Sequence, residues 1–279
     1  MSRFLMSLAS HFPLAFLHAA GALLGWAIYG LSPTYRRHLR DNLQTAGFFD
    51  AATRRAAISG AGRLLGEIPA VWLRARGTVA ALVRRVDGKE YVDAARAAGQ
   101  GIVFLTPHLG CFEVAAQVAA EHFPITVLYQ PPKLAWLRPL IEGGRLRDNV
   151  RLARADLSGV RELVGALSRG EAVGILPDQV PGEGEGEWAD FFGKPAYTMT
   201  LALKLARRPN TACLLAWGER LPGGRGYVIH LRPMPPAEPG ESEARHLNRA
   251  IEALVRECPG QYLWGYNRYK RPRGASAPP

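Results

Sequence analysis

Residues 101–113 read GIVFLTPHLGCFE, and this stretch decides the fold. Residues 101–107 form a short apolar run closed by a proline, a pattern typical of a buried strand. Residues 111–123 then carry apolar side chains at helical spacing. The stretch therefore predicts a strand, a tight turn that contains His108, and a helix.

The same alternation of strand and helix patterns continues on both sides of this unit. The other runs that predict strands are 124–130, 171–179, 211–218 and 226–232. The segments that predict helices are 34–98, which is also basic, Asp156–Arg169, Tyr197–Arg208 and Ser242–Cys258. Asp156 or Ser158 can cap the second of these helices, and Pro259 ends the last one. This order favours an α/β fold with a mixed, mainly parallel sheet flanked by helices.

Composition narrows the classes of protein that need to be considered. The 279 residues are 48% hydrophobic and 21% charged, which excludes a disordered chain and a collagen-like repeat. A net charge of +11 favours a polyanionic partner: nucleic acid, an anionic bilayer, a phosphorylated substrate or an acidic carrier protein. Three cysteines without a CxxC pair argue against a disulfide framework and a structural zinc site, and favour a reducing, cytoplasm-facing location.

The first 31 residues indicate a membrane anchor. Phe12–Leu31 contains no charged side chain and as a helix would be about 30 Å long, the thickness of a bilayer core. A signal peptide fits poorly, and a buried core helix is the remaining alternative to an anchor that spans the bilayer or lies in its interface. Arg36, Arg37 and Arg40 follow at once, which predicts that residues 32–279 lie on the cytoplasmic face. These residues divide into a helical lead-in (32–99), an α/β core (100–270) and a frayed tail (271–279).

His108 and Glu113 form an H-x4-E pattern beyond the end of the predicted strand, where α/β sheets bind ligands. Two helical residues five apart lie about 140° from each other, so this pair can meet only if His108 is in the loop before the helix. The carboxylate would then hold the imidazole while the other ring nitrogen removes a proton. A structural histidine is the alternative interpretation of this pattern when it stands alone.

The motif and its surroundings resemble the lipid A biosynthesis acyltransferases of Gram-negative bacteria, the lauroyl/myristoyl (late) acyltransferase family. That family carries H-x4-D/E after a strand of a glycerolipid-acyltransferase-like α/β fold. The matching blocks are LSPTYRRHLRDNL (31–43), TPHLGCFE (106–113), GGRLRDN (143–149), GILPDQ (174–179), FFGKPAYTMT (191–200) and QYLWGYNRYKRP (261–272). The resemblance implies transfer of a fatty acyl chain from acyl carrier protein to a phosphorylated lipid A precursor at the anionic inner membrane, with no cofactor, metal or nucleic acid.

Four site residues follow from the resemblance. It makes His108 the general base and Glu113 the residue that orients it. Arg145 would bind a phosphate or carboxylate of the substrate, and Asp178 would position Arg145 or the substrate. The alternatives are a surface helix charge for Arg145 and an N-cap or turn residue for Asp178.

Other interpretations remain open at this stage. Cys111 could form an acyl-enzyme, although a packing role is favoured and the family forms no such intermediate. The chain could be a related acyltransferase that uses another glycolipid or a phospholipid as acceptor. A basic, noncatalytic membrane protein or nucleic-acid-binding protein would explain the charge but not the motif.

Overall fold

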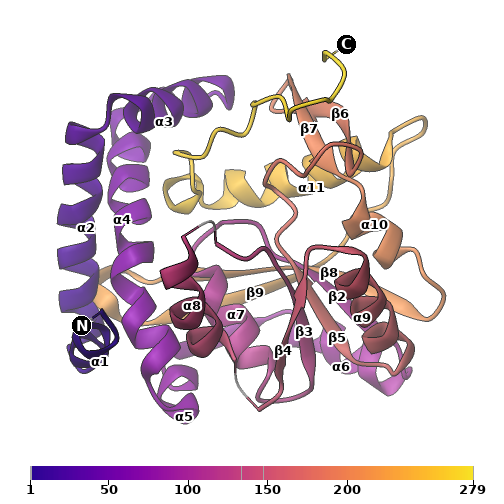
Figure 1. Ribbon diagram of the computed structural model, residues 1–279, viewed down its shortest axis with the longest axis horizontal. Coiled ribbons are helices and arrows are strands. Elements are labelled where there is room, and N and C mark those ends of the chain that lie inside the picture. The colour runs from indigo at the N-terminus through magenta and orange to yellow at the C-terminus, as the bar shows by residue number, and fades with distance from the viewer. Residues whose placement is uncertain (1, 133, 147, 279) are drawn as a thin grey trace.

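The computed structural model describes residues 2–278 except 133 and 147 (Figure 1). Its centre is a seven-stranded sheet in the order β1-β9-β8-β2-β5-β3-β4. These strands are β1 (Val83–Asp87), β2 (Gly101–Leu105), β3 (Ile125–Tyr129), β4 (Val150–Arg154), β5 (Ala172–Ile175), β8 (Thr211–Arg220) and β9 (Tyr227–Pro233). Neighbouring strands are parallel except β8 and β9, which run antiparallel. The prediction of a mixed, mainly parallel sheet is confirmed.

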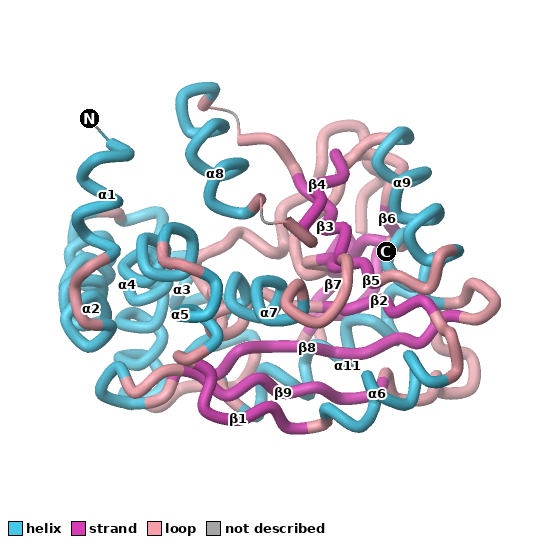
Figure 2. Tube along the Cα trace, turned by 90° about the horizontal axis from the view of Figure 1, so that it is seen from below, coloured by secondary structure: helices cyan, strands magenta, loops and turns pink. Residues whose placement is uncertain are grey.

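Helices cover both faces of this sheet. The helices are α1 (Ser2–Ser10), α2 (Leu14–Leu31), α3 (Pro33–Thr45), α4 (Ala51–Leu73), α5 (Arg76–Ala80), α6 (Lys89–Ala97), α7 (Phe112–Ala119), α8 (Arg138–Arg145), α9 (Leu157–Ser168), α10 (Leu201–Ala206) and α11 (Glu243–Glu257). Figures 1 and 2 show α6 and α11 on opposite sides of the sheet. In β2, Ile102 and Phe104 join the core under α6 and α7, whereas Val103 and Leu105 join the core under α9, α10 and α11. Because successive strand side chains point to opposite faces, the apolar run of β2 contributes to both cores.

Side-chain caps fix the ends of the long helices. Asp156 accepts hydrogen bonds from the backbone amides of Ser158 and Gly159 at the start of α9, which confirms that it is the N-cap. Ser242 caps α11 in the same way. A short 3₁₀ turn, η3 (Pro259–Gln261), follows α11 and leads the chain back to the turn after β2, where Tyr262 pairs with Leu109.

The N-terminal helix α2 packs along α4 (Figure 1). Glycines permit the close approach, since a Cβ added at Gly62 would lie 2.0 Å from the Gly21 carbonyl oxygen. Only one stripe of α2 is buried by this contact, and the rest of its surface is exposed and apolar. Within the described chain, α2 is the helix that is long and apolar enough to cross a membrane.

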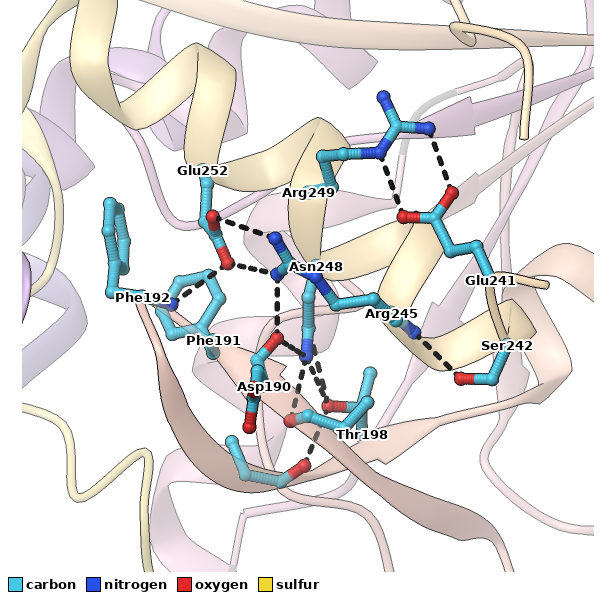
Figure 3. Close-up of polar contacts among 12 residues, drawn as sticks. Asp190, Phe191, Phe192, Thr198, Glu241, Ser242, Arg245, Asn248, Arg249 and Glu252 are labelled. Atoms are coloured by element: carbon cyan, nitrogen blue, oxygen red, sulfur yellow. Dashed lines mark hydrogen bonds and ion pairs between the residues drawn. The ribbon is translucent and has the colours of Figure 1, made fainter. Parts of the chain in front are cut away.

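An antiparallel hairpin, β6 (Gly186–Phe191) and β7 (Lys194–Met199), lies on α11 outside the main sheet. Figure 3 shows the polar contacts that hold it there. Asn248 donates to the backbone oxygen of Asp190 at 3.0 Å and to the Thr198 hydroxyl at 2.9 Å. Glu252 accepts from the backbone amide of Phe192 at 2.8 Å and from Arg245 at 2.5 Å. Since buried polar groups are costly unless paired, these contacts fix the hairpin on the helix.

The structure differs from the sequence prediction in three segments. Residues 83–87, inside the segment predicted as helical, form edge strand β1, and residues 150–154 form the opposite edge strand β4. Each edge strand has two arginines among its five residues, so both lack the continuous apolar run of the central strands. Residues 197–199, predicted as the start of a helix, end β7 instead, and the helix begins at Leu201.

Candidate active site

The candidate site lies beyond the carboxyl ends of two adjacent parallel strands, β2 and β5. Leu105 and Ile175, the last residues of these strands, are paired in register. Each strand is followed by the same short pattern, one residue and then a proline, before the polar side chain of His108 or Asp178. Equal spacing from paired residues brings these two side chains to one place.

His108 is held by Asp178 through two hydrogen bonds. Asp178 accepts from the His108 ring nitrogen Nδ1 at 2.7 Å and from the His108 backbone amide at 2.9 Å. The His108 side chain is 13% exposed and the Asp178 side chain 2%. Burial acts to raise the pKa of Asp178, but the His108 ring and the hydrogen bonds outweigh it, so the pKa lies below its usual value.

The ionised state of Asp178 determines the tautomer of His108. A carboxylate can only accept hydrogen bonds, so Nδ1 carries a proton, and in the neutral ring the lone pair is on Nε2. The side-chain amide of Gln179 donates to Nε2 at 3.1 Å. An acceptor hydroxyl that takes the place of this amide would meet a nitrogen ready to remove its proton.

Glu113 pairs with Arg145 and not with His108. Arg145, the last residue of α8, places its Nε 3.1 Å from each Glu113 carboxylate oxygen, and its Nη2 also donates to Oε1. The indole of Trp72 donates to Glu113 Oε2 at 3.1 Å. These contacts satisfy the buried carboxylate, and the Arg145 guanidinium also lies over the rings of Trp72 and Tyr129.

The structure therefore corrects the predicted partners of the two carboxylates, Glu113 and Asp178. The sequence predicts that Glu113 orients His108 and that Asp178 positions Arg145 or the substrate. The structure exchanges the partners: Asp178 holds His108, and Glu113 holds Arg145. The reason is the sheet register, which places Asp178 beside His108, while Glu113 on α7 faces α8 and α4.

The turn that carries His108 is held tightly by its own backbone. Gly110 has φ +61°, and a Cβ there would lie 2.0 Å from the Gly218 carbonyl oxygen. The amide of Cys111 donates to that same oxygen at 2.7 Å, and the carbonyl of His108 accepts from the amide of Leu263 at 3.0 Å. The Cys111 side chain is fully buried, and burial raises the pKa of its thiol well above the usual value. This environment supports a packing role for Cys111.

Two cavities meet beside His108. The first, called the polar cavity, is lined by His108, Glu113, Arg145 and Gln179 together with apolar side chains such as Met199. The second lies between the sheet and helices α6 and α7 and is lined mainly by apolar side chains. Both cavities share Phe112, Ala116, Val127 and Leu176, and the ring of Phe112 packs edge-on against His108 with centroids 4.8 Å apart. The two cavities are therefore adjacent and share a wall beside His108.

Three of the four predicted residues, His108, Glu113 and Arg145, line the polar cavity, and the buried Asp178 reaches it only through His108. Sequence reasoning missed two other residues. Gln179 directly follows Asp178, but its role could not be predicted because only the fold shows that its amide reaches Nε2 of His108. Trp72 lies near the end of α4, 41 residues before Glu113, so no local pattern connects the two. Among the described residues, no group of three or more His, Cys, Asp or Glu side chains could hold a metal ion.

Comparisons with known proteins point to a single family. The family model described as "Bacterial lipid A biosynthesis acyltransferase" matches residues 2–271. The "Lipid A biosynthesis lauroyltransferase" of Escherichia coli (strain K12) is 30% identical over 198 residues, which are 68% of this chain and 63% of that protein. The "Lipid A biosynthesis palmitoleoyltransferase" of the same organism is 29% identical, over 69% of this chain and 63% of that protein. The matched region thus spans less than two thirds of these relatives.

Proposed function

Because this chain belongs to the bacterial lipid A biosynthesis acyltransferase family, we propose that it moves a fatty acyl chain from a carrier thioester to a hydroxyl of a lipid A precursor. The observation that carries this proposal is the His108–Asp178 pair at the junction of a polar and an apolar cavity. Acyl carrier protein is the proposed donor, since its acidic surface complements the net charge of +11.

In this mechanism His108 is the general base. Its Nε2 takes the proton of the acceptor hydroxyl while the hydroxyl oxygen attacks the thioester carbonyl carbon. The carbon–sulfur bond then breaks, and the thiolate leaves with the proton that His108 returns. Asp178 holds the neutral ring in the tautomer with the proton on Nδ1, and it stabilises the imidazolium during the reaction. A thioester is already activated, so no acyl-enzyme is needed.

Arg145 is the proposed binding residue for a phosphate of the acceptor. Its guanidinium lies in the wall of the polar cavity, one quarter exposed, and is held in place by Glu113. Arginine binds phosphate through two parallel hydrogen bonds, and a prearranged guanidinium loses little freedom in doing so. The Glu113–Arg145 pair would thus orient the acceptor so that the acceptor hydroxyl lies at His108.

The apolar cavity suits the fatty acyl chain. Its walls come from β2, β9, α6 and α7 and include Phe104, Phe112, Phe123 and Leu231. A hydrocarbon chain that enters it would leave water and be stabilised by roughly 0.8 kcal/mol for each buried methylene group. Since this cavity reaches Phe112, the thioester carbon at the end of the chain would lie near His108.

The N-terminal helices would attach the enzyme to the membrane that contains its acceptor. Large apolar side chains are exposed along α1 and α2: Phe4, Leu8, Phe12, Phe16, Leu23, Leu24, Trp26 and Leu31. Arg37 and Arg40 are exposed at the start of α3, where they would meet anionic head groups. Attachment on the cytoplasmic face would give access to a cytoplasmic carrier protein.

The direct test is an assay of the purified protein with acyl carrier protein loaded with a fatty acid and with a phosphorylated lipid A precursor. The expected product is the precursor with one more ester-linked acyl chain, identified by mass spectrometry. Transfer to a different glycolipid or to a phospholipid, with none to the precursor, would replace the acceptor in this proposal. Absence of transfer to all of these acceptors would reject it.

A further inference from the structure

A buried ion pair lies behind the turn that carries His108. Arg220, the last residue of β8, places its Nε 2.9 Å from both carboxylate oxygens of Glu67 and its Nη2 2.6 Å from Oε1. The side chains are 4% and 1% exposed. Glu67 belongs to α4, so the pair joins the N-terminal helices to the central sheet.

The same guanidinium reaches the catalytic turn. Arg220 Nη2 donates to the carbonyl oxygen of Gly110 at 2.6 Å. The amide of Gly110 donates to the carbonyl oxygen of Gln261 at 3.0 Å, and the Gln261 side chain bonds the backbone amide and carbonyl of Arg220. Gly110, two residues after His108, is thus held at both its amide and its carbonyl by groups that are themselves bonded to each other.

Glu67 also connects this turn to the apolar helix α2. His18 of α2 and the hydroxyl of Tyr227 each lie 3.0 Å from Glu67 Oε2. Burial acts to raise the pKa of Glu67, but Arg220 and His18 outweigh it and lower that pKa to about 2. Glu67 is therefore ionised at neutral pH and pairs with a guanidinium that is always charged.

We propose that Arg220, held by Glu67, is a positioning residue that sets His108 against Asp178 and the cavity. A buried ion pair offers little net stability compared with apolar side chains of similar size, so geometry is its distinctive contribution. Neither residue lines either cavity. Loss of the pair should therefore lower kcat and leave KM nearly unchanged, because displacement of a catalytic group by about 1 Å can cost on the order of 100-fold in rate. This inference rests on the proposed acyl transfer.

The experiment removes both charges together. The double variant Glu67→Met/Arg220→Met removes the carboxylate and the guanidinium together, so that neither is left buried without the other, and thermal unfolding checks that the variant folds. We expect its kcat to fall by about 10- to 100-fold with KM within twofold, and hydrogen exchange of the peptide 106–113 to become faster. A matched control is Glu241→Met/Arg249→Met, which removes an ion pair between α11 and the segment before it (Figure 3), whose described contacts do not involve residues 108–111. The control should retain kcat and the exchange rate of 106–113.

Arg220→Lys provides a second variant if the double variant does not fold. The lysine ammonium is compact and cannot reproduce the planar guanidinium that binds Glu67 and the Gly110 carbonyl at the same time, so kcat should fall in this variant as well. Unchanged kcat and unchanged exchange of 106–113 in a folded variant would overturn the inference. Hydrogen exchange needs no substrate, so it tests the contact with the turn separately from the reaction. If the unchanged protein transfers no acyl chain but the folded variants still exchange 106–113 faster, the contact is supported and only the proposed function is rejected.

Discussion

Replacement of Asp178 by asparagine tests the tautomer argument with a small change in shape. The asparagine oxygen can still accept the hydrogen bond from the His108 backbone amide. Its NH2 group then faces the ring nitrogen Nδ1 and donates to it, which moves the ring proton to Nε2. His108 would have the right position but no lone pair for the acceptor hydroxyl.

The size of the effect follows from the role assigned to His108. General base catalysis contributes about 10²- to 10⁴-fold, which corresponds to roughly 3–5 kcal/mol in the activation free energy. Stability should change much less, because the variant keeps both hydrogen bonds to His108 and replaces the carboxylate with an amide of the same shape. We expect the free energy of unfolding to change by about 1–2 kcal/mol.

The assay compares kcat, KM and thermal unfolding for Asp178→Asn with those for Asp190→Asn, an exposed aspartate on β6. We predict that Asp178→Asn loses kcat by about 10²- to 10⁴-fold at a nearly unchanged KM, and that the control stays active. A folded Asp178→Asn protein with more than one tenth of the original kcat would refute the assignment of Asp178 to His108.

Three other predictions concern the acceptor site, acid stability and membrane attachment. Arg145→Ala should raise KM for the phosphorylated acceptor by about 10-fold or more and Arg145→Lys by less; equal KM values would remove Arg145 from the phosphate site. The pKa of Glu67 is lowered in the fold to about 2, so the stability that its carboxylate contributes is complete above about pH 4.5 and is lost as the pH falls toward 2. The free energy of unfolding, measured against pH, should therefore lack this acid-dependent part in Glu67→Gln. At neutral pH this variant should be about 3–5 kcal/mol less stable than the unchanged protein. Phe16→Asp/Leu23→Asp places charges on the exposed face of α2 and should release the protein from lipid vesicles in a flotation assay, whereas retention would assign attachment to another surface.

Much of the fold could be predicted from periodicity and turn residues, but not the edges of the sheet. The central strands β2, β3 and β5 are buried on both faces and therefore show as continuous apolar runs. The edge strands β1 and β4 are half exposed, and their arginines conceal them in a basic sequence. The hairpin β6–β7 is also only partly buried and depends on α11, which is distant in sequence.

The candidate site was predicted as a set of residues but not as a set of contacts. His108 and Glu113 are close in sequence, which favours them as partners when the fold is unknown. Asp178 lies 70 residues away, and β3 and β4 intervene along the chain, so its contact with His108 exists only because β5 pairs directly with β2. The similar strand endings before His108 and Asp178 are the sequence signal that could have suggested this pairing.

The central claim is direct transfer from the carrier thioester to a lipid hydroxyl with His108 as the base. Its most direct test is a single-turnover reaction with radiolabelled acyl carrier protein thioester, with and without the phosphorylated acceptor. We predict that label appears in the lipid only when acceptor is present, that no label stays on the protein, that His108→Ala lowers the rate by about 10²- to 10⁴-fold, and that Cys111→Ser does not. Label bound to Cys111 together with an inactive Cys111→Ser variant, or an unchanged rate in His108→Ala, would contradict the account.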